Sequence, residues 1–371
     1  MGAKESMRCK PCKYANHPYH WGNHEPDHSG QSRVQLERRE DAMRALVYTA
    51  PRQLRLEEWP RPTPANGEVE IAVSAAGICG SDISGFLGHS RRRIPPMVMG
   101  HELVGRMSNG QRVVANPLIS CGRCTACLGG SQNQCSSWRL LGMDRTSGCY
   151  ADYVSIPETQ IYAIPDDLSD ERAVIAEPLA NIVHLFRIAA PQTFFRMGIV
   201  GGGTMGSLAL LAAKRLGVRE VLVEDVNDLR LQVSRNMGAT LAANASTEEG
   251  RTDARRFAGT GLDLVLDASG TSDARQAAFD LCRPGGTIVL LGMGQEKSEI
   301  DFVTSIRKEH RVVMSFAYTP VDFERSLALL KAREIDIAPW TVEMALEQGQ
   351  QAFDRMTTNP GDTLKVLLRV N

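Results

Sequence analysis

The chain has 371 residues, which suggests two or three domains because a typical domain takes about 150 residues. Hydrophobic residues make up 43% and charged residues 23% of the chain, as in an average globular protein, and the formal net charge is −1. No excess of basic charge attracts nucleic acid or an anionic membrane, so we expect neither as a partner. The apolar stretch 197–213 approaches the minimum membrane span of about 17 residues, but glycines interrupt it and favour a strand, a turn and a helix.

Residues 1–42 are polar, and Cys9, Cys12, His24 and His28 come one residue short of the spacing of a two-cysteine, two-histidine zinc finger. The segment has neither the apolar core of a secretory signal nor the apolar positions that a finger packs on its metal. We expect a disordered tail, or an extension upstream of a natural start at Met43, in a cytoplasmic protein. Nine cysteines in such a chain point to thiolates and metal rather than to disulfides.

Short strands are predicted from Arg44 to about Pro165, because apolar and polar side chains alternate between prolines and glycines. From Glu171 onward, predicted strands alternate with predicted helices. Short Val-, Ile- and Leu-rich runs between helices indicate a buried parallel sheet. The predicted strands of this sheet include 197–202, 218–225, 262–269 and 286–292, and the helices include 204–217 and 228–238. The chain ends in a strand-like run at 364–370.

A glycine turn follows the first of these strands: Gly201, Gly203 and Gly206 fit the G-x-G-x-x-G pattern. Such glycines permit a tight turn and let a pyrophosphate approach the helix N-terminus, whose unpaired N–H groups attract it. Asp225 ends the next strand about 20 residues on, where a carboxylate binds a ribose diol and repels a 2′-phosphate. We therefore predict an NAD site with at least a tenfold preference for NAD over NADP. In this site Arg230 pairs with Asp225 or contacts the ribose. The alternative is a glycine-rich turn in an ordinary α/β domain. The predicted cofactor residues are Gly201, Gly203, Thr204, Met205, Gly206, Asp225 and Arg230.

A cluster of cysteines gives a second signal, since Cys121, Cys124 and Cys127 are spaced by two residues and Cys135 follows. Four thiolates surround one zinc ion tetrahedrally and leave no open position for a substrate. The common spacings of iron–sulfur ligands differ from this one. We therefore predict a structural zinc that stabilises a lobe and performs no chemistry.

A third, dispersed signal consists of Cys79, Ser81, His101, Glu102 and Glu177. A catalytic zinc needs two or three protein ligands and one open position. The Cys79 thiolate, the His101 imidazole and a carboxylate from Glu102 or Glu177 meet this need. Spacing alone favours the hypothesis weakly, because a lone buried Cys or His is more often a packed core residue.

The segments GICGSD, GHELVG, CGRCTAC, AEPLA and VGGGTMG, in this order, resemble the zinc-dependent medium-chain dehydrogenase/reductase superfamily. The similarity runs from Met43 to Asn371. AEPL places a glutamate where simple alcohol dehydrogenases carry a cysteine, so the chain is most similar to the polyol branch (sorbitol, galactitol-1-phosphate and threonine dehydrogenases). The resemblance implies an α/β fold in which a GroES-like β-barrel catalytic domain surrounds a Rossmann domain with a doubly wound parallel sheet. The expected domains are the extension 1–42, the catalytic domain with its zinc lobe 43–182, the Rossmann domain 183–316 and the completing segment 317–371.

The resemblance also implies two zinc ions per chain. Cys79, His101 and Glu102 or Glu177 would hold the catalytic ion, and the four cysteines of the lobe the structural ion. Zinc lowers the pKa of a substrate hydroxyl, the resulting alkoxide carbon releases hydride to nicotinamide, and the Ser81 hydroxyl relays the proton. Many relatives continue this relay with a histidine where the chain has Ser84, so the onward route through water or His89 stays open.

We expect a zinc-dependent oxidoreductase that transfers hydride from a secondary alcohol or polyol, including a sugar alcohol or its phosphate, to NAD. A homo-oligomer, dimer or tetramer, is the expected assembly. The alternatives are a zinc-stabilised NAD-binding protein without turnover and a primary-alcohol or aldehyde dehydrogenase of the same superfamily. The intact ligand set favours the enzyme, because a sensor has no use for an open zinc site.

The remaining polar features have simpler expected roles. The run 91–93 of three arginines could grip a substrate phosphate or carboxylate, but charge runs are usually solvated, and we expect a solvated loop. We expect packed side chains at Cys149, Cys282, His184 and His310.

Overall fold

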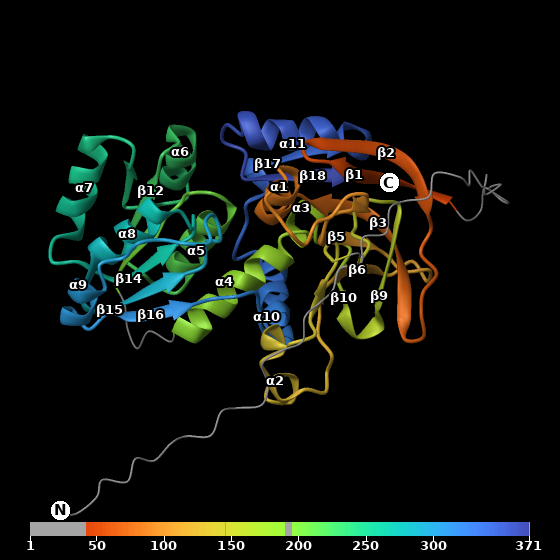
Figure 1. Cartoon of the computed structure of the whole chain (residues 1–371), viewed down its shortest axis with the longest axis horizontal. Helices are drawn as coiled ribbons and strands as arrows, with labels where there is room; N and C mark the ends of the chain where they lie inside the picture. Colours follow the sequence, from red (N-terminus) through yellow and green to blue (C-terminus); the bar gives the residue numbers. More distant parts are fainter. Residues whose placement is uncertain (1–41, 145, 190–194, 371) are drawn as a thin grey trace, which may run out of the picture. The chain divides into compact units, whose positions relative to one another are not determined.

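The structure, a computed structural model, describes residues 42–144, 146–189 and 195–370 (Figure 1). Our expectations for Cys9, Cys12, His24 and His28 concern residues outside these ranges. None of the described helices combines the length and the hydrophobicity that a membrane span requires.

Mostly antiparallel strands build the N-terminal part of the described chain (Figure 1). They are β1 (Ala42–Ala50), β2 (Gln53–Pro60), β3 (Glu68–Gly77), β4 (Met97–Val98), β5 (Glu102–Arg106), β6 (Arg112–Ala115), β7 (Leu118–Ile119), β8 (Arg139–Leu140), β9 (Tyr153–Pro157) and β10 (Ile161–Ala163). The C-terminal segment adds β17 (Thr341–Ala345) and β18 (Lys365–Arg369). One sheet has the order β2-β1-β4 and a seven-stranded sheet the order β10-β6-β5-β3-β18-β17, with β9 also paired to β3. The last strand of the chain therefore completes the sheet that the first part begins.

A six-stranded parallel sheet lies between these two parts of the sequence. Its strands are β11 (Arg196–Val200), β12 (Glu220–Asp225), β13 (Leu241–Asn244), β14 (Leu262–Asp267), β15 (Cys282–Leu290) and β16 (Arg311–Met314). Their spatial order, β13-β12-β11-β14-β15-β16, is the 3-2-1-4-5-6 order of a Rossmann sheet. The predicted fold class, a GroES-like β-domain with a doubly wound parallel sheet, is confirmed. The stretch 197–213 is the strand, turn and helix that its glycines indicated.

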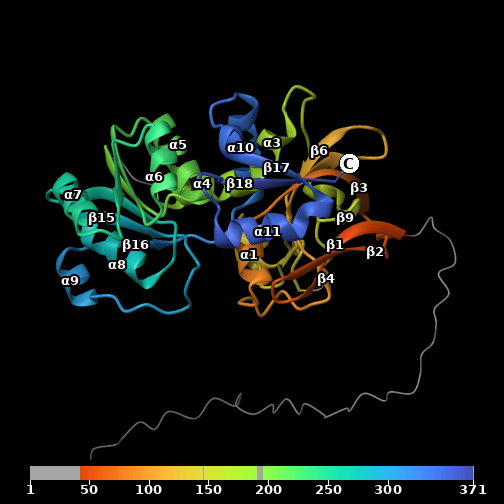
Figure 2. The ribbon, with the colours of Figure 1, turned by 90° about the horizontal axis from the view of Figure 1, so that it is seen from above.

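The described helices lie along both the parallel sheet and the antiparallel part (Figure 2). They are α1 (Gly80–Phe86), α2 (Thr125–Leu128), α3 (Asp170–Ala173), α4 (Ala176–Ala189), α5 (Thr204–Arg215), α6 (Asp228–Asn236), α7 (Glu248–Ala258), α8 (Ser272–Leu281), α9 (Phe302–Arg307), α10 (Pro320–Lys331) and α11 (Gly349–Thr358). Helix α4 contacts α5, β5 and α10, so it joins the Rossmann sheet to the antiparallel part.

The packed side chains behave largely as predicted. Cys149, Cys282 and His184 are buried, whereas His310 is half-buried. His184 Nδ1 lies 2.8 Å from Asp322 Oδ2 on α10, and its Nε2 lies 3.3 Å from Asn133 Nδ2 of the cysteine lobe. This histidine therefore connects the lobe to α10 through hydrogen bonds.

Candidate active site

The register of two neighbouring strands brings the predicted catalytic ligands together. In the antiparallel pair β3 and β5, Gly77 lies opposite Glu102. Cys79 follows the end of β3 as the N-cap of α1, and His101 immediately precedes β5. The ligand atoms of Cys79, His101 and Glu102 consequently lie within 4.8 Å of one another. Sulfur, imidazole nitrogen and carboxylate oxygen in one small cluster are a donor set that zinc accepts.

An acidic side chain lies behind the His101 ring. Its Nδ1 lies 3.4 Å from Asp82 Oδ2, so its Nε2 is the nitrogen free to bind a metal. Burial would lower the pKa of His101, but the negative charges of Asp82 and Cys79 outweigh it and raise that pKa above its ordinary value. The cluster therefore has the negative potential that attracts a cation.

Asp82 itself is fully buried at the start of α1. Burial would raise the pKa of Asp82, but His101, Arg93 and the hydroxyl of Tyr150 lower it well below its usual range. The Tyr150 hydroxyl donates to Asp82 Oδ2 at 2.8 Å. Asp82 is therefore an ionised carboxylate held in the interior beside the predicted zinc site.

Glu102 is held by a lysine from the far end of the chain. Lys365 Nζ on β18 lies 2.7 Å from both carboxylate oxygens of Glu102 and donates to the carbonyl of Ile78 at 3.1 Å. Both side chains are buried. Gly77 makes room for the carboxylate, since a Cβ at that position would lie 2.1 Å from Glu102 Oε2. Burial would lower the pKa of Lys365, but Glu102 and Cys79 raise it, so the amine stays protonated.

Glu177 approaches the same centre from the first turn of α4. Burial and the charge of Glu102 raise its pKa, while His101 lowers it, so these groups share one electrostatic environment. The structure does not place Glu177 within the 4.8 Å group of Cys79, His101 and Glu102. The hydroxyl of Tyr318 is buried and near enough to Glu177 for each to influence the pKa of the other.

The four lobe cysteines also converge. The ligand atoms of Cys121, Cys124, Cys127 and Cys135 lie within 4.8 Å of one another. Cys124 Sγ lies 3.4 Å and Cys121 Sγ lies 3.9 Å from Cys127 Sγ. The backbone N–H groups of Cys121 and Ser137 point at Cys135 Sγ at 3.3 and 3.4 Å. N–H groups directed at sulfur stabilise thiolates, so the lobe fits a structural zinc ion.

The glycine turn has the geometry of a dinucleotide-binding turn. Gly201 has a φ of 108°, and a Cβ on Gly206 would lie 1.8 Å from the Gly201 carbonyl oxygen. Gly203 is the N-cap of α5. Met205 is half-buried in the first turn of that helix, and the Thr204 hydroxyl donates to the Leu364 carbonyl, so this side chain ties α5 to the C-terminal segment.

Asp225 lies beside this turn. Its Oδ2 accepts a hydrogen bond from the Gly202 N–H at 2.7 Å, and its Oδ1 accepts one from Asn227 N–H at 2.8 Å. Arg230 Nη1 lies 3.9 Å from Asp225 Oδ2, a loose ion pair of the kind we predicted. The carboxylate is therefore fixed at the end of β12, where the ribose of a bound dinucleotide would lie.

The three consecutive arginines differ from one another, and our expectation of a solvated loop is wrong for Arg93. Arg91 is exposed. Arg92 pairs with Asp144 and lies over the Trp138 ring, 3.9 Å from its centroid. Arg93 is 3% exposed and forms a 2.7 Å ion pair with Asp82. A buried carboxylate needs a counter-charge, and Arg93 supplies it.

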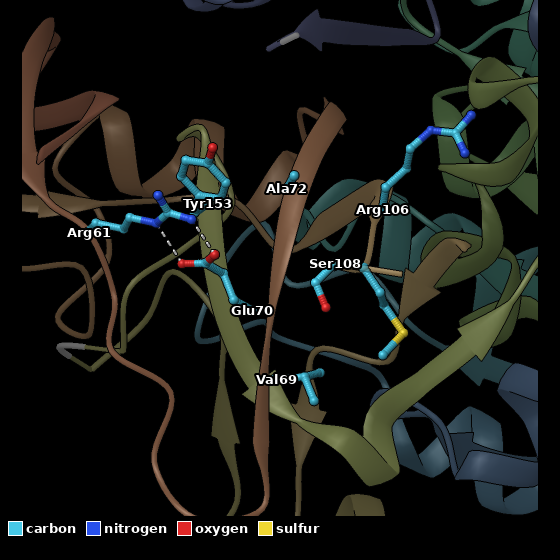
Figure 3. A pocket seen from close by; sticks show the side chains of 8 residues that line it. Arg61, Val69, Glu70, Ala72, Arg106, Ser108 and Tyr153 are labelled. Carbon is cyan, nitrogen blue, oxygen red and sulfur yellow. Dashed lines mark hydrogen bonds and ion pairs between the residues drawn. The ribbon is translucent and has the colours of Figure 1, made fainter. Parts of the chain in front are cut away.

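A surface pocket elsewhere contains none of the predicted site residues (Figure 3). It lies among side chains of β3, β9 and the turn after β5. Arg61 and Glu70 form a bidentate ion pair there at 2.8 and 2.6 Å, and the Arg61 guanidinium stacks on the Tyr153 ring. These contacts pair Arg61 with Glu70, and we assign the pocket no function.

Comparisons with known proteins agree with the fold. Residues 65–166 match the family model of the alcohol dehydrogenase GroES-like domain, and residues 204–332 match that of the zinc-binding dehydrogenase. The chain is 32% identical over 333 residues to the L-threonine 3-dehydrogenase of Shewanella baltica strain OS185, covering 84% of this chain and 95% of that protein. It is 28% identical over 348 residues to the sorbitol dehydrogenase of Bacillus subtilis, covering 89% and 98%.

Solved structures give the same result. An alcohol dehydrogenase from Escherichia coli CFT073 in complex with NADH superposes with a TM-score of 0.82 at 27% identity, covering 89% of this chain and 100% of that one. Galactitol-1-phosphate dehydrogenase from Escherichia coli has a TM-score of 0.79 at 26% identity, covering 88% and 100%. The chain therefore belongs to the zinc-dependent medium-chain dehydrogenase/reductase superfamily, in its polyol dehydrogenase-like branch, and is a zinc-dependent oxidoreductase that transfers hydride from a CH–OH group to NAD.

Proposed function

We propose that this enzyme oxidises a secondary alcohol or polyol at a zinc ion held by Cys79, His101 and a glutamate. The observation that carries the proposal is the cluster of Cys79, His101 and Glu102 ligand atoms within 4.8 Å, with the Glu177 carboxylate in the same electrostatic environment. The relatives named above act, by their names, on threonine, sorbitol and galactitol-1-phosphate. Each of these compounds carries a secondary hydroxyl next to another polar group, which defines the substrate class to test.

The chain's own residues would position the groups that react. Zinc, when bound, lowers the pKa of a substrate hydroxyl and favours loss of its proton. The Ser81 hydroxyl lies 3.5 Å from Cys79 Sγ, close enough to the metal site to take that proton. Arg93 donates to Ser81 Oγ at 3.1 Å, and the Ser81 hydroxyl donates to Cys79 Sγ, so both contacts hold the serine oxygen beside the metal site. The glycine turn and Asp225 would hold NAD, which would supply the hydride acceptor.

The two glutamates have different proposed roles. Glu102 is fixed by Lys365, so it serves as a rigid carboxylate beside Cys79 and His101. Glu177 has no such cation within ion-pair distance among the described contacts; Asn181 Nδ2 lies 3.5 Å from its Oε1. We assign Glu177 to the open side of the site, where it can approach the metal or the substrate.

Metal analysis and a substrate screen test this function. The wild-type protein should contain two zinc ions per chain, Cys79→Ala one, and Cys282→Ala, a control at a buried cysteine outside both clusters, two. The screen should offer sugar alcohols, their phosphates, 2,3-diols and threonine with NAD. A single zinc in wild-type protein, together with NAD binding and no turnover, would support the non-enzymatic alternative. Activity confined to primary alcohols would support the other alternative.

We further propose that the enzyme is a homo-oligomer, a dimer or a tetramer. The strand β16 is an edge of the parallel sheet, and well-exposed apolar side chains gather on it and on α9, including Phe302, Ile306 and Met314. An apolar sheet edge favours pairing with another chain. Light scattering coupled to size exclusion measures the mass, and a monomer at micromolar concentration would contradict the proposal.

A cytoplasmic location is proposed because four thiolates must remain reduced to hold zinc in the lobe. Fractionation of the source cells with an antibody against the protein would test it.

A further inference from the structure

Arg93 connects two groups of the proposed zinc centre. Its Nη2 atom donates to Asp82 Oδ1 at 2.7 Å and to Ser81 Oγ at 3.1 Å. Its side chain is 2% exposed and lies across α1 at Gly85, where a Cβ would come within 2.2 Å of Arg93 Cδ. A glycine at position 85 is therefore required for the arginine to reach the start of the helix.

The contact with Asp82 orients a metal ligand indirectly. Arg93 occupies Oδ1, and this leaves Oδ2 turned toward His101 Nδ1 at 3.4 Å. His101 is neutral when it binds zinc through its other nitrogen. Among the described residues, Arg93 is then the cation that forms an ion pair with Asp82. A carboxylate behind a metal-binding histidine fixes the ring, and loss of such a partner typically costs about 10- to 100-fold in metal affinity or activity.

The contact with Ser81 determines which way its hydroxyl can act. Arginine only donates hydrogen bonds, so Ser81 Oγ is the acceptor in this pair. The same oxygen lies 3.5 Å from Cys79 Sγ. Arg93 therefore holds the Ser81 oxygen beside the metal site, while the Ser81 hydroxyl donates to Cys79 Sγ.

We propose that Arg93 is a positioning residue of the catalytic zinc centre. It fixes the ring of His101 through Asp82, and it fixes the hydroxyl of Ser81 directly. The inference rests on the proposed site, and it goes beyond it by giving the buried arginine a role in turnover and in metal retention.

The test compares Arg93→Met, Arg93→Lys and Gly85→Ala with Arg91→Met, a matched control at the exposed arginine two positions away. Four quantities are measured: kcat, the KM for NAD, the rate of zinc loss to a chelator, and the visible spectrum of the cobalt-substituted protein. Thermal unfolding of each variant reports on folding.

Arg93→Met should lower kcat and speed the loss of one zinc ion by about 10- to 100-fold each, leave the KM for NAD within about twofold, and shift the cobalt bands. Arg93→Lys, which keeps the charge but reaches less far, should fall between Arg93→Met and wild type. Gly85→Ala should act like Arg93→Met although alanine favours the helix, because its methyl group displaces the arginine. Arg91→Met should match wild type.

Two results would overturn the proposal. One is Arg93→Met protein whose kcat, zinc loss and cobalt spectrum equal those of Arg91→Met. The other is a lowered unfolding temperature with an unchanged spectrum and zinc loss, which would indicate a purely structural arginine. If Arg93→Met fails to fold, Arg93→Lys and Gly85→Ala decide by the same criteria. If wild-type protein oxidises no alcohol, the proposed function fails, and zinc loss and the cobalt spectrum still test Arg93.

Discussion

Replacing Lys365 by methionine tests how strongly Glu102 depends on its buried partner. Lys365 Nζ contacts both carboxylate oxygens at 2.7 Å, and the two side chains are 2% and 0% exposed. Methionine fills similar space, but it leaves a carboxylate in the interior without a counter-charge. Removing one partner of such a pair costs about 3–5 kcal/mol of folding free energy.

This cost converts into a shift of the unfolding temperature. The described residues run from 42 to 370, with gaps at 145 and 190–194. With about 330 residues and about 2.1 cal/mol/K of unfolding entropy per residue, the entropy is about 0.7 kcal/mol/K, and the expected fall is about 4–7 °C. Circular dichroism of purified protein during heating measures it.

Two further variants make the measurement specific. Lys331→Met, at an exposed lysine whose Nζ donates to the Ala163 carbonyl at 3.3 Å, should shift the unfolding temperature by less than about 1 °C. Adding Glu102→Gln to Lys365→Met removes the uncompensated charge and should restore at least half of the loss. Our reasoning is refuted if Lys365→Met unfolds at the wild-type temperature, or if the double variant is no more stable than the single one.

Three other outcomes are expected. Asp225→Ser should reduce the preference for NAD over NADP, measured as the ratio of the two kcat/KM values, from at least tenfold to near unity, and a wild-type enzyme that prefers NADP would contradict the assignment. Glu177→Ala should lower kcat at least 100-fold with little change in unfolding temperature, whereas Cys135→Ala should mainly lower the unfolding temperature and lose one zinc. Near-normal turnover by folded Glu177→Ala protein would overturn the assignment of Glu177 to the active site. Burial would raise the pKa of Asp322, but hydrogen bonds from Arg187 and His184 hold it well below its usual range. A carboxylate whose pKa is lower in the folded than in the unfolded state stabilises the fold at pH values above the unfolded pKa of about 4. Asp322→Asn should therefore lower the free energy of unfolding, measured in urea, most at pH 7. The difference between this variant and the wild type should disappear as the pH falls below about 4.

The fold and the ligand types could be predicted from local patterns. The glycine turn, the four spaced cysteines and the Val- and Leu-rich strands each depend on residues close together in the sequence. The strand β13 and the helix α7 lack such a signal, because β13 is a short Leu-Ala-Ala-Asn run and α7 is dominated by charged side chains. Their presence follows from the sheet and helices around them.

The partners of the site residues could not be predicted, because they depend on pairings across the fold. Lys365 lies 263 positions from Glu102, and only the pairing of β18 with β3 brings them together. A lysine at the start of the short apolar run 366–368 was the available signal. Arg93 lies 11 positions from Asp82. Its place in a run of three arginines predicted an exposed side chain, and only the burial of Asp82 explains why Arg93 is buried.

The buried charges around the site explain why both cations are needed. Cys79, Asp82, Glu102 and Glu177 contribute four negative charges when all are ionised. Arg93 and Lys365 contribute two positive charges, each through an ion pair of 2.7 Å. The remaining two negative charges match one divalent ion, so the loaded site is neutral overall. Loss of either cation leaves excess negative charge, which opposes formation of a substrate alkoxide as well as folding. For this reason we expect Lys365→Met to lower kcat in the folded enzyme, whereas the Lys331→Met control should not.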